Sequence, residues 1–282
     1  RIDECPLGSG ATGGTSWPLN RKRVGTLLGF ENLVTNTIEG VAGWDHITEF
    51  ASDNAIYMSS LSRFASEIQL WSTDEYKVVE LDNSFAGISS MMPQKKNPDA
   101  LERSRKASAN SVGQLMSILT SLNAIEYKHN GTRSPIEPKS FDAVLASTHA
   151  MTGLTQTLHI NNEVMLKYAK ENFSTMTDVA DLLVKKNGID FRDAHEIVAD
   201  VVNAALKESK TSDKISLKMV KDAAYHRLNK KINISENELK AALDPVQSVK
   251  RKTGICMPAA SSVSEMIKIA LNDIEEKQNW IN

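Results

Sequence analysis

Apolar residues recur at three- and four-residue steps through three long segments in the first part of the chain. These segments span residues 45–72, 98–122 and 139–158, and a shorter one spans 20–33. This period places apolar side chains along one face of an α-helix, and no stretch shows the two-residue alternation of a half-buried strand. The pattern predicts an all-α protein that begins with a bundle of long helices. We expect Asp45 to cap the first long helix.

Beyond about residue 161 the predicted helices become shorter. Their ranges are 162–171, 175–187, 191–209, 215–228, 235–243 and 258–280. Ser235 and Glu238 have the spacing of a capping box at the start of the fifth. We therefore predict a helical bundle domain over residues 1–160 and a smaller C-terminal helical domain over residues 161–282.

A polar loop over residues 84–98 separates the first two long helices. Glycine and serine near its start disfavour a helix, and Pro93 and Pro98 each lack a donor N–H. Its two hydroxyls, two ammonium groups and amide side chains can bind small carboxylates and move a proton. A loop of this length is often a lid or a binding loop, and the plain alternative is a solvated polar connection.

Composition narrows the class of protein. With 41% hydrophobic and 24% charged residues, the 282-residue chain is typical of a folded globular protein. A formal net charge of −2 argues against nucleic-acid binding, and no apolar run is long enough to cross a bilayer. Because the chain begins at Arg1 rather than at methionine, we expect it to be a piece of a longer polypeptide.

Neither a metal nor an organic cofactor is expected. Cys5 and Cys256 lie too far apart to build a disulfide framework or a zinc ligand set, which favours a reducing cytoplasm. The glycines at positions 8, 10 and 13 follow the order Gly-x-Gly-x-x-Gly, but no strand precedes them, so we reject a dinucleotide site. We interpret His149 and His195 as structural residues.

The polar loop carries a specific signature. The run SSMMPQKKNP at residues 89–98, followed by Glu102, resembles the signature of the fumarase/aspartase superfamily in the form used by argininosuccinate lyases. Further similar stretches extend the resemblance over essentially the whole chain: residues 6–11, 36–39, 177–183, 191–198 and 243–249. The family's Thr-His-x-Gln motif and N-terminal domain would precede Arg1.

The resemblance implies a lyase that eliminates an amine from an N-substituted aspartate to give fumarate. Argininosuccinate, which would release arginine, is the first expected substrate. The resemblance assigns catalysis to Ser89 as the base, to Lys95, and to Glu102, which would support a histidine located before Arg1. It places Ser90, Asn97 and Tyr127 in substrate binding. It also implies a homotetramer whose active sites take residues from three chains.

The chemistry of this reaction fits the loop. Removing a proton from the carbon beside a carboxylate creates an aci-carboxylate dianion, which needs cations and hydrogen-bond donors where the charge develops. Lys95 offers a point charge, Asn97 a donor amide, and the loop backbone further N–H groups. Only one of the two adjacent lysines can face the site, and we expect Lys95 rather than Lys96.

Departures from the family pattern concern mainly the amine half of the substrate. Gly87 stands one place earlier than the family's glycine, and Trp44 stands where the family usually has arginine. The segment after Tyr127 lacks the family's glutamine and lysine. Arg133 or Lys139 is the candidate replacement for the missing lysine. Two alternatives therefore stay open: a paralogous C–N lyase for another N-substituted aspartate, and an inactive structural relative comparable to a lens crystallin.

Overall fold

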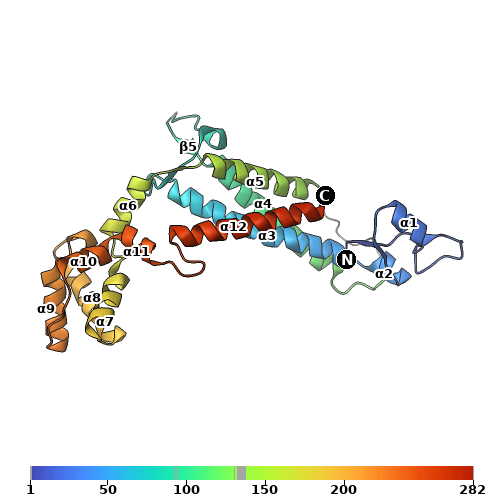
Figure 1. Cartoon of the computed structure of the whole chain (residues 1–282). Coiled ribbons are helices and arrows are strands. Elements are labelled where there is room, and N and C mark those ends of the chain that lie inside the picture. The colour runs from blue at the N-terminus through green and yellow to red at the C-terminus, as the bar shows by residue number, and fades with distance from the viewer. Residues whose placement is uncertain (1, 93, 130, 132–137, 282) are drawn as a thin grey trace. The chain divides into compact units, whose positions relative to one another are not determined.

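The structure, a computed structural model, describes residues 2–92, 94–129, 131 and 138–281. The chain divides into two compact units, Arg1–Asn161 and Asn162–Asn282. Helices make up most of both units (Figure 1), which confirms the all-α class. The described residues also contain strands of two residues each, which the sequence pattern did not predict. Strands this short are invisible to periodicity, because two residues cannot show an alternation.

The first unit begins with a small lobe ahead of the long helices. Its elements are β1 (Glu4–Cys5), α1 (Arg21–Leu27), β2 (Asn32–Leu33) and α2 (Thr37–Ala42), and β1 pairs in parallel with β2. The side chain of Asn20 caps α1 by accepting a hydrogen bond from the Arg23 amide. The helix ends before the predicted residue 33, and Gly29 just beyond its end adopts a φ of 84°. Periodicity did not predict α2, which is only six residues long.

Arg21 fixes the glycine-rich segment of this lobe. Its guanidinium donates to the carbonyl oxygens of Leu7, at 3.1 Å, and Val34, at 2.9 Å. Gly10 has a φ of 72°, and a Cβ at this position would collide with the backbone of Gly14. The glycines therefore serve a tight turn that folds back on itself.

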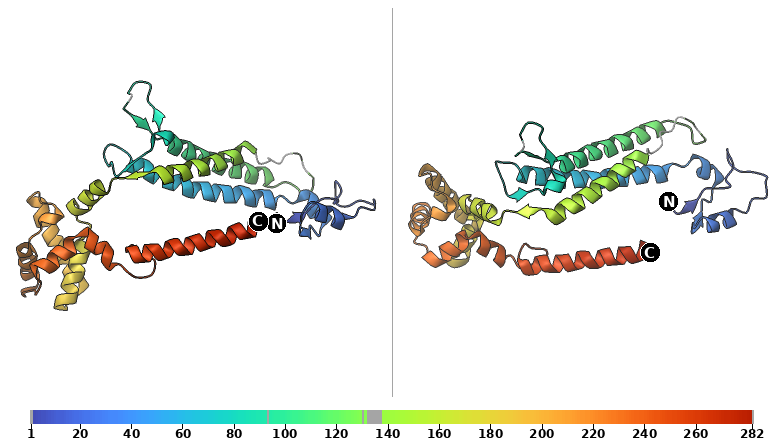
Figure 2. Two further views of the ribbon diagram at one scale, coloured as in Figure 1. Left: turned by 45° about the horizontal axis from the view of Figure 1, so that its top comes forward. Right: turned by 90° about the horizontal axis from the view of Figure 1, so that it is seen from above.

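Three long helices form the rest of the first unit: α3 (Asp45–Trp71), α4 (Asp99–Leu122) and α5 (Pro138–Thr157). They pack side by side in Figures 1 and 2, and their bounds confirm the three predicted long helices. Met58, Ala107 and Val144 contribute one buried residue from each helix to their shared core. The predicted cap was wrong, because Trp44 is the N-cap and Asp45 is the first helical residue. Asp45 still places a negative charge in the first turn, where the helix dipole favours it.

Short strand pairs organise the end of the bundle where α3 and α5 finish and α4 begins. β3 (Val79–Glu80) pairs antiparallel with β6 (His159–Ile160), which directly follows α5. After a 3₁₀ turn over Asn83–Phe85, β4 (Gly87–Ile88) pairs antiparallel with β5 (Lys96–Asn97). The predicted loop is thus a hairpin that projects from this end of the bundle (Figure 2).

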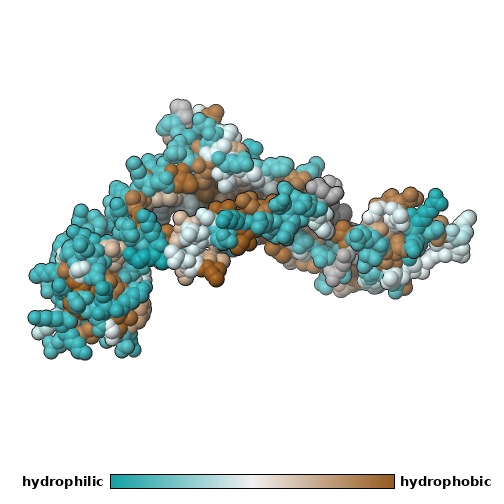
Figure 3. Space-filling model, viewed as in Figure 1, coloured by the Kyte–Doolittle hydropathy of each residue, from teal (hydrophilic) through white to brown (hydrophobic). Residues whose placement is uncertain are grey.

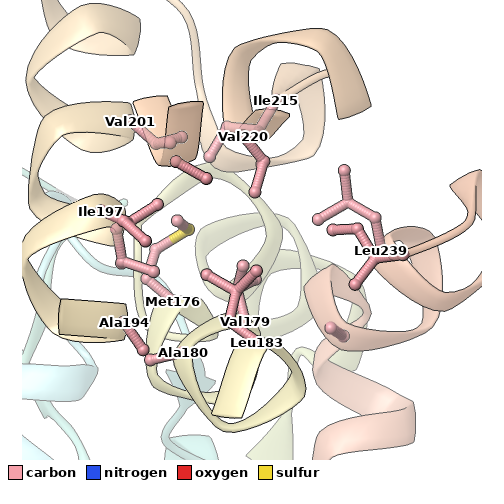
Figure 4. Close-up of a cluster of buried hydrophobic side chains, with 14 of the residues drawn as sticks. Met176, Val179, Ala180, Leu183, Ala194, Ile197, Val201, Ile215, Val220 and Leu239 are labelled. Carbon is pink, nitrogen blue, oxygen red and sulfur yellow. The ribbon is translucent and has the colours of Figure 1, made fainter. Parts of the chain in front are cut away.

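Over its described residues, the second unit combines six shorter helices with α12, a helix of 22 residues that buries none of them. The helices are α6 (Asn162–Glu171), α7 (Met176–Asn187), α8 (Phe191–Lys207), α9 (Leu217–Leu228), α10 (Glu236–Leu243), α11 (Pro245–Arg251) and α12 (Ala260–Ile281). Apolar side chains from α7, α8, α9 and α10 meet in one buried core (Figure 4). The structure confirms the capping box of Ser235 and Glu238. The seven-residue helix α11 was not predicted.

Large apolar side chains also lie on the outside of the long helices. Figure 3 shows hydrophobic side chains at the surface among hydrophilic ones. In the bundle the exposed set comprises Ile56, Phe64 and Leu70 of α3, Val112, Met116 and Leu119 of α4, and Phe141 and Leu145 of α5. Among the described residues, none of the helices has the length and apolar character that a membrane crossing requires.

Candidate active site

The hairpin between α3 and α4 holds most of the predicted site residues. Gly87 pairs with Asn97 and Ile88 with Lys96, and the described residues 89–92, 94 and 95 belong to the tip. A Cβ at Gly87 would collide with the carboxylate of Asp99, at the start of α4. The early glycine is therefore required where the hairpin meets the helix, and Ile88, which follows it, is exposed.

Ser89 lies at the first turn of the hairpin tip and is half-buried. Its Oγ accepts hydrogen bonds from the backbone amides of Met91, at 3.3 Å, and Met92, at 3.1 Å. Serine side chains commonly close such turns. Two N–H groups directed at one oxygen also favour negative charge on that oxygen. The loop backbone thus supplies the donors that a negatively charged Ser89 Oγ would require.

The two lysines of the hairpin lie in different settings. Lys95 is exposed at the tip, where its amide donates to the Met92 carbonyl at 3.0 Å. Lys96 instead reaches back to β3, where its Nζ donates to Glu80 Oε1 at 2.7 Å and to the Leu81 carbonyl at 3.1 Å. This hydrogen bond and the Lys96 charge lower the pKa of the Glu80 carboxyl. Lys96 is therefore engaged, and the choice of Lys95 for the site stays a prediction.

The other predicted site residues near the hairpin lie on its tip, on β5 and in the first turn of α4. Ser90 is exposed on the tip, and Asn97 is half-buried in β5. Glu102 is exposed in the first turn of α4, one helical turn beyond Pro98. A cleft of 760 Å³ between the hairpin and the end of α3 is lined by Gln69, Glu80, Lys95 and Lys96, among others. Its size falls in the range of small-molecule sites.

Tyr127 lies at the opposite end of the bundle. It follows α4, whose 24 residues extend for about 36 Å at 1.5 Å per residue. Its hydroxyl donates a hydrogen bond to the carboxylate of Glu39 on α2. Within one chain, Ser89 and Lys95 lie on the hairpin and Glu102 lies in the first turn of the helix that follows it, whereas Tyr127 lies beyond the other end of that helix. Arg133, a candidate replacement for the family's lysine, lies outside the described residues, and Lys139 is exposed at the start of α5.

Sequence reasoning missed two acidic residues beside the hairpin. Glu80 lies 16 residues before its partner Lys96, and no motif spacing links the two. Asp99 follows the signature directly, yet its contact with the hairpin depends on the strand pairing that periodicity could not reveal. The early position of Gly87 was noted only as a departure from the family pattern, and a close approach of backbone to another group at this glycine is the signal that could have been drawn from it.

Comparisons with known proteins identify the family of the chain. The family model described as "Lyase" matches residues 1–113, and the one described as "Argininosuccinate lyase C-terminal" matches residues 173–250. An argininosuccinate lyase from Clostridium perfringens is 37% identical over 285 residues and covers 100% of this chain. This chain belongs to the fumarase/aspartase superfamily. It spans 59% of the length of that superfamily relative.

Two solved structures have the same fold and higher identity. A crystal structure of EDDS lyase in complex with formate is 57% identical, with a TM-score of 0.96, over 99% of this chain and 56% of that chain. An EDDS lyase variant with bound fumarate is 56% identical, with the same TM-score and coverage. Within the superfamily, then, these EDDS lyases match this chain in sequence better than the clostridial argininosuccinate lyase does.

Proposed function

We propose that the polypeptide containing this chain is a C–N lyase that eliminates an amine from an N-substituted aspartate and releases fumarate. The observation that carries the proposal is the hairpin itself. It presents the superfamily signature with the Ser89 Oγ held by two backbone amides. Superfamily membership supports the reaction class, and the fumarate bound to the related EDDS lyase variant supports the product.

Ser89 acts as the base in this proposal. A serine hydroxyl is a very weak base in water, so it must work as a desolvated alkoxide or near-alkoxide. The amides of Met91 and Met92 stabilise that charge. Closure of the exposed hairpin tip over a substrate would expel water and strengthen both interactions.

The product carboxylates require cations and donors near the hairpin. Lys95 contributes a positive charge from the tip, and Ser90 and Asn97 contribute hydrogen-bond donors. These groups stabilise the dianion that forms when the proton leaves carbon. Glu102 supports a histidine that, in the superfamily pattern, comes from a segment before residue 1.

A complete site requires more than one copy of the chain. Tyr127 and the hairpin lie at opposite ends of α4, so the same chain cannot bring both to one substrate. The exposed apolar side chains of α3, α4 and α5 provide surfaces on which copies can pack. In a homotetramer with antiparallel bundles, the Tyr127 end of one chain would meet the hairpin end of another.

The second part of the proposal concerns the identity of the leaving amine. The higher identity to the EDDS lyases, and the divergent segment after Tyr127, favour an amine other than arginine. Argininosuccinate remains the second candidate because many curated relatives have that name. Both candidates share the aspartate half of the substrate and the release of fumarate.

A serine substitution tests the base. In the native polypeptide, Ser89→Ala should lower kcat by at least about 100-fold, the lower end for loss of a general base, and leave the assembly intact. Fumarate release is followed by ultraviolet absorbance, and assembly by light scattering. Ser84→Ala, at an exposed serine on the same connection, is the control. More than a few per cent of wild-type activity in Ser89→Ala would overturn the base assignment.

A panel of substrates tests the amine. EDDS, argininosuccinate, adenylosuccinate and aspartate are compared for fumarate release at equal concentration. The proposal expects the highest kcat/KM with EDDS, and a preference for argininosuccinate would reverse the order of the two candidates. If none of the four releases fumarate, a structural role without catalysis replaces the enzyme hypothesis.

A further inference from the structure

The base of the hairpin is joined to the body of the bundle by an ion pair. Lys96 lies on β5, and its Nζ donates to Glu80 Oε1 at 2.7 Å and to the Leu81 carbonyl at 3.1 Å. Glu80 belongs to β3, a different strand pair from the hairpin. We name this connection the Lys96–Glu80 tether.

The strand that carries Glu80 is firmly held. It pairs with β6 through Val79 and Ile160 and through Glu80 and His159. Asn161 adds two bonds to the residues just before β3: its amide donates to the Val78 carbonyl at 3.0 Å, and its side chain donates to the Lys77 carbonyl at 2.7 Å. Val79 and Leu81 on either side of Glu80 are buried. Glu80 is thus a fixed point at the end of the bundle.

The hairpin has little internal support by comparison. Each of its strands has two residues, and an isolated two-stranded hairpin is marginally stable in water. Ile88 and Met91 are 89% and 88% exposed, so neither packs the hairpin onto the bundle. Its position therefore depends on the few contacts at its base, among which the tether joins it to β3.

The geometry points to Glu80 as a positioning residue for the hairpin, acting through Lys96. Neighbouring side chains on a strand point to opposite faces, so Asn97 faces away from the side on which Lys96 binds Glu80. Holding Lys96 to Glu80 consequently fixes the orientation of Asn97, and of Lys95 and Ser89 beyond it. The inference rests on the proposed function, because these three groups serve the elimination.

The test uses Glu80→Gln and Lys96→Met in the native polypeptide. We expect Glu80→Gln to lower kcat about two- to five-fold, the range for an exposed ion pair, with a smaller change in KM. The double variant should be no slower than the slower single variant, because both remove one interaction. Lys96→Arg keeps the cation and should restore kcat.

Hydrogen exchange gives a readout that does not depend on the reaction. Amides of residues 87–97 should exchange faster in Glu80→Gln, while the melting temperature stays unchanged. Asp222→Asn is the matched control, because it breaks an exposed ion pair with Lys218, at 3.4 Å, on α9 of the second unit. This control should leave both kcat and hairpin exchange at wild-type values.

Two results would overturn the inference. In the first, exchange over 87–97 is the same in Glu80→Gln, Asp222→Asn and wild type, so the tether does not hold the hairpin. In the second, exchange rises but kcat does not fall, so the tether does not position the reacting groups. Failure of the proposed function is distinguishable, because wild type would then release no fumarate while the exchange difference persists.

Discussion

The two units of this chain bury their apolar residues in different ways. In the second unit, helices α7 to α10 enclose a continuous core, where Leu183 is 0% exposed. In the first unit, the long helices also bury apolar residues, such as Leu101 and Ile118, yet Met116 on α4 is 55% exposed. Both units are mainly helical, so helix content does not explain the contrast.

Helix geometry explains the contrast better. Short helices can cross around a common centre and close a core within one chain. Three parallel or antiparallel long helices leave an apolar face on each helix that only further helices can cover. Val112, Met116 and Leu119 lie at i, i+4 and i+7 on α4 and form such a face. The core of α7 to α10 is therefore closed within one chain. The faces of the bundle helices, like those of α12, which buries none of its described residues, stay open to partners.

The largest effect is expected from a charge placed on the exposed apolar face of α4, which we predict to be covered by another chain. We expect Met116→Glu to prevent assembly and reduce fumarate release to background, because a carboxylate buried between chains loses its hydration without gaining a partner. Light scattering measures the assembly, and ultraviolet absorbance measures the activity. The second unit should stay folded, as judged by hydrogen exchange of α7 and α8.

A control on the same helix shows whether the effect comes from the position of the new charge or from the charge itself. Asn110 is exposed and, by helical spacing, lies on the side of α4 opposite Val112. Asn110→Glu should leave the assembly intact. A Met116→Glu protein with unchanged mass in solution would show that this face is not an interface.

Two leucine-to-alanine substitutions, one in each unit, test the same contrast with smaller expected effects. Leu183→Ala should lower the free energy of unfolding of the second unit by about 2–5 kcal/mol, because it leaves a cavity in a closed core. Leu119→Ala, at a side chain 43% exposed in one chain, should instead weaken association between chains. Urea unfolding at several protein concentrations tells them apart, since only the second effect depends on concentration. Equal concentration dependence in both variants would contradict the contrast.

The long elements of the fold were predictable from sequence because they repeat one signal many times. α3, α4 and α5 each contain several turns with the same apolar period, and their predicted bounds were within about two residues. α2, α11 and the two-residue strands were missed because they are too short to show a period. The cap at Asp45 was misplaced by one residue, because Trp44 has the non-helical backbone and makes no side-chain cap hydrogen bond.

The site was predictable only where the sequence keeps its members together. Ser89, Lys95 and Glu102 lie within one signature, so the chain brings them to one end of α4. The contact of Lys96 with Glu80 depends on a strand pairing, and that of Tyr127 with Glu39 on the way the lobe meets the bundle. Neither is encoded in local spacing. The roles of the signature residues stay predictions until the serine and lysine variants are measured.

The smallest expected effect concerns the edge of the second unit, at the capping box of α10. Hydrogen bonds from Lys186 and from Ser235 lower the pKa of Glu238 to about 2, from 4.5. Because the folded-state pKa is depressed, the ionised carboxylate stabilises the unit fully above about pH 4.5, and this contribution is lost as the pH falls toward 2.

Glu238→Gln therefore tests whether this edge depends on charge or on hydrogen bonding. Glutamine can still complete a capping box, so only the charge-dependent part should disappear. We expect the variant to be less stable than wild type at pH 7, and the difference to shrink steadily between pH 4.5 and 2. Thermal unfolding across that range measures it, and Glu236→Gln, in the first turn of the same helix, controls for the loss of one carboxylate. A difference independent of pH would show that the Lys186–Glu238 ion pair adds nothing to the cap.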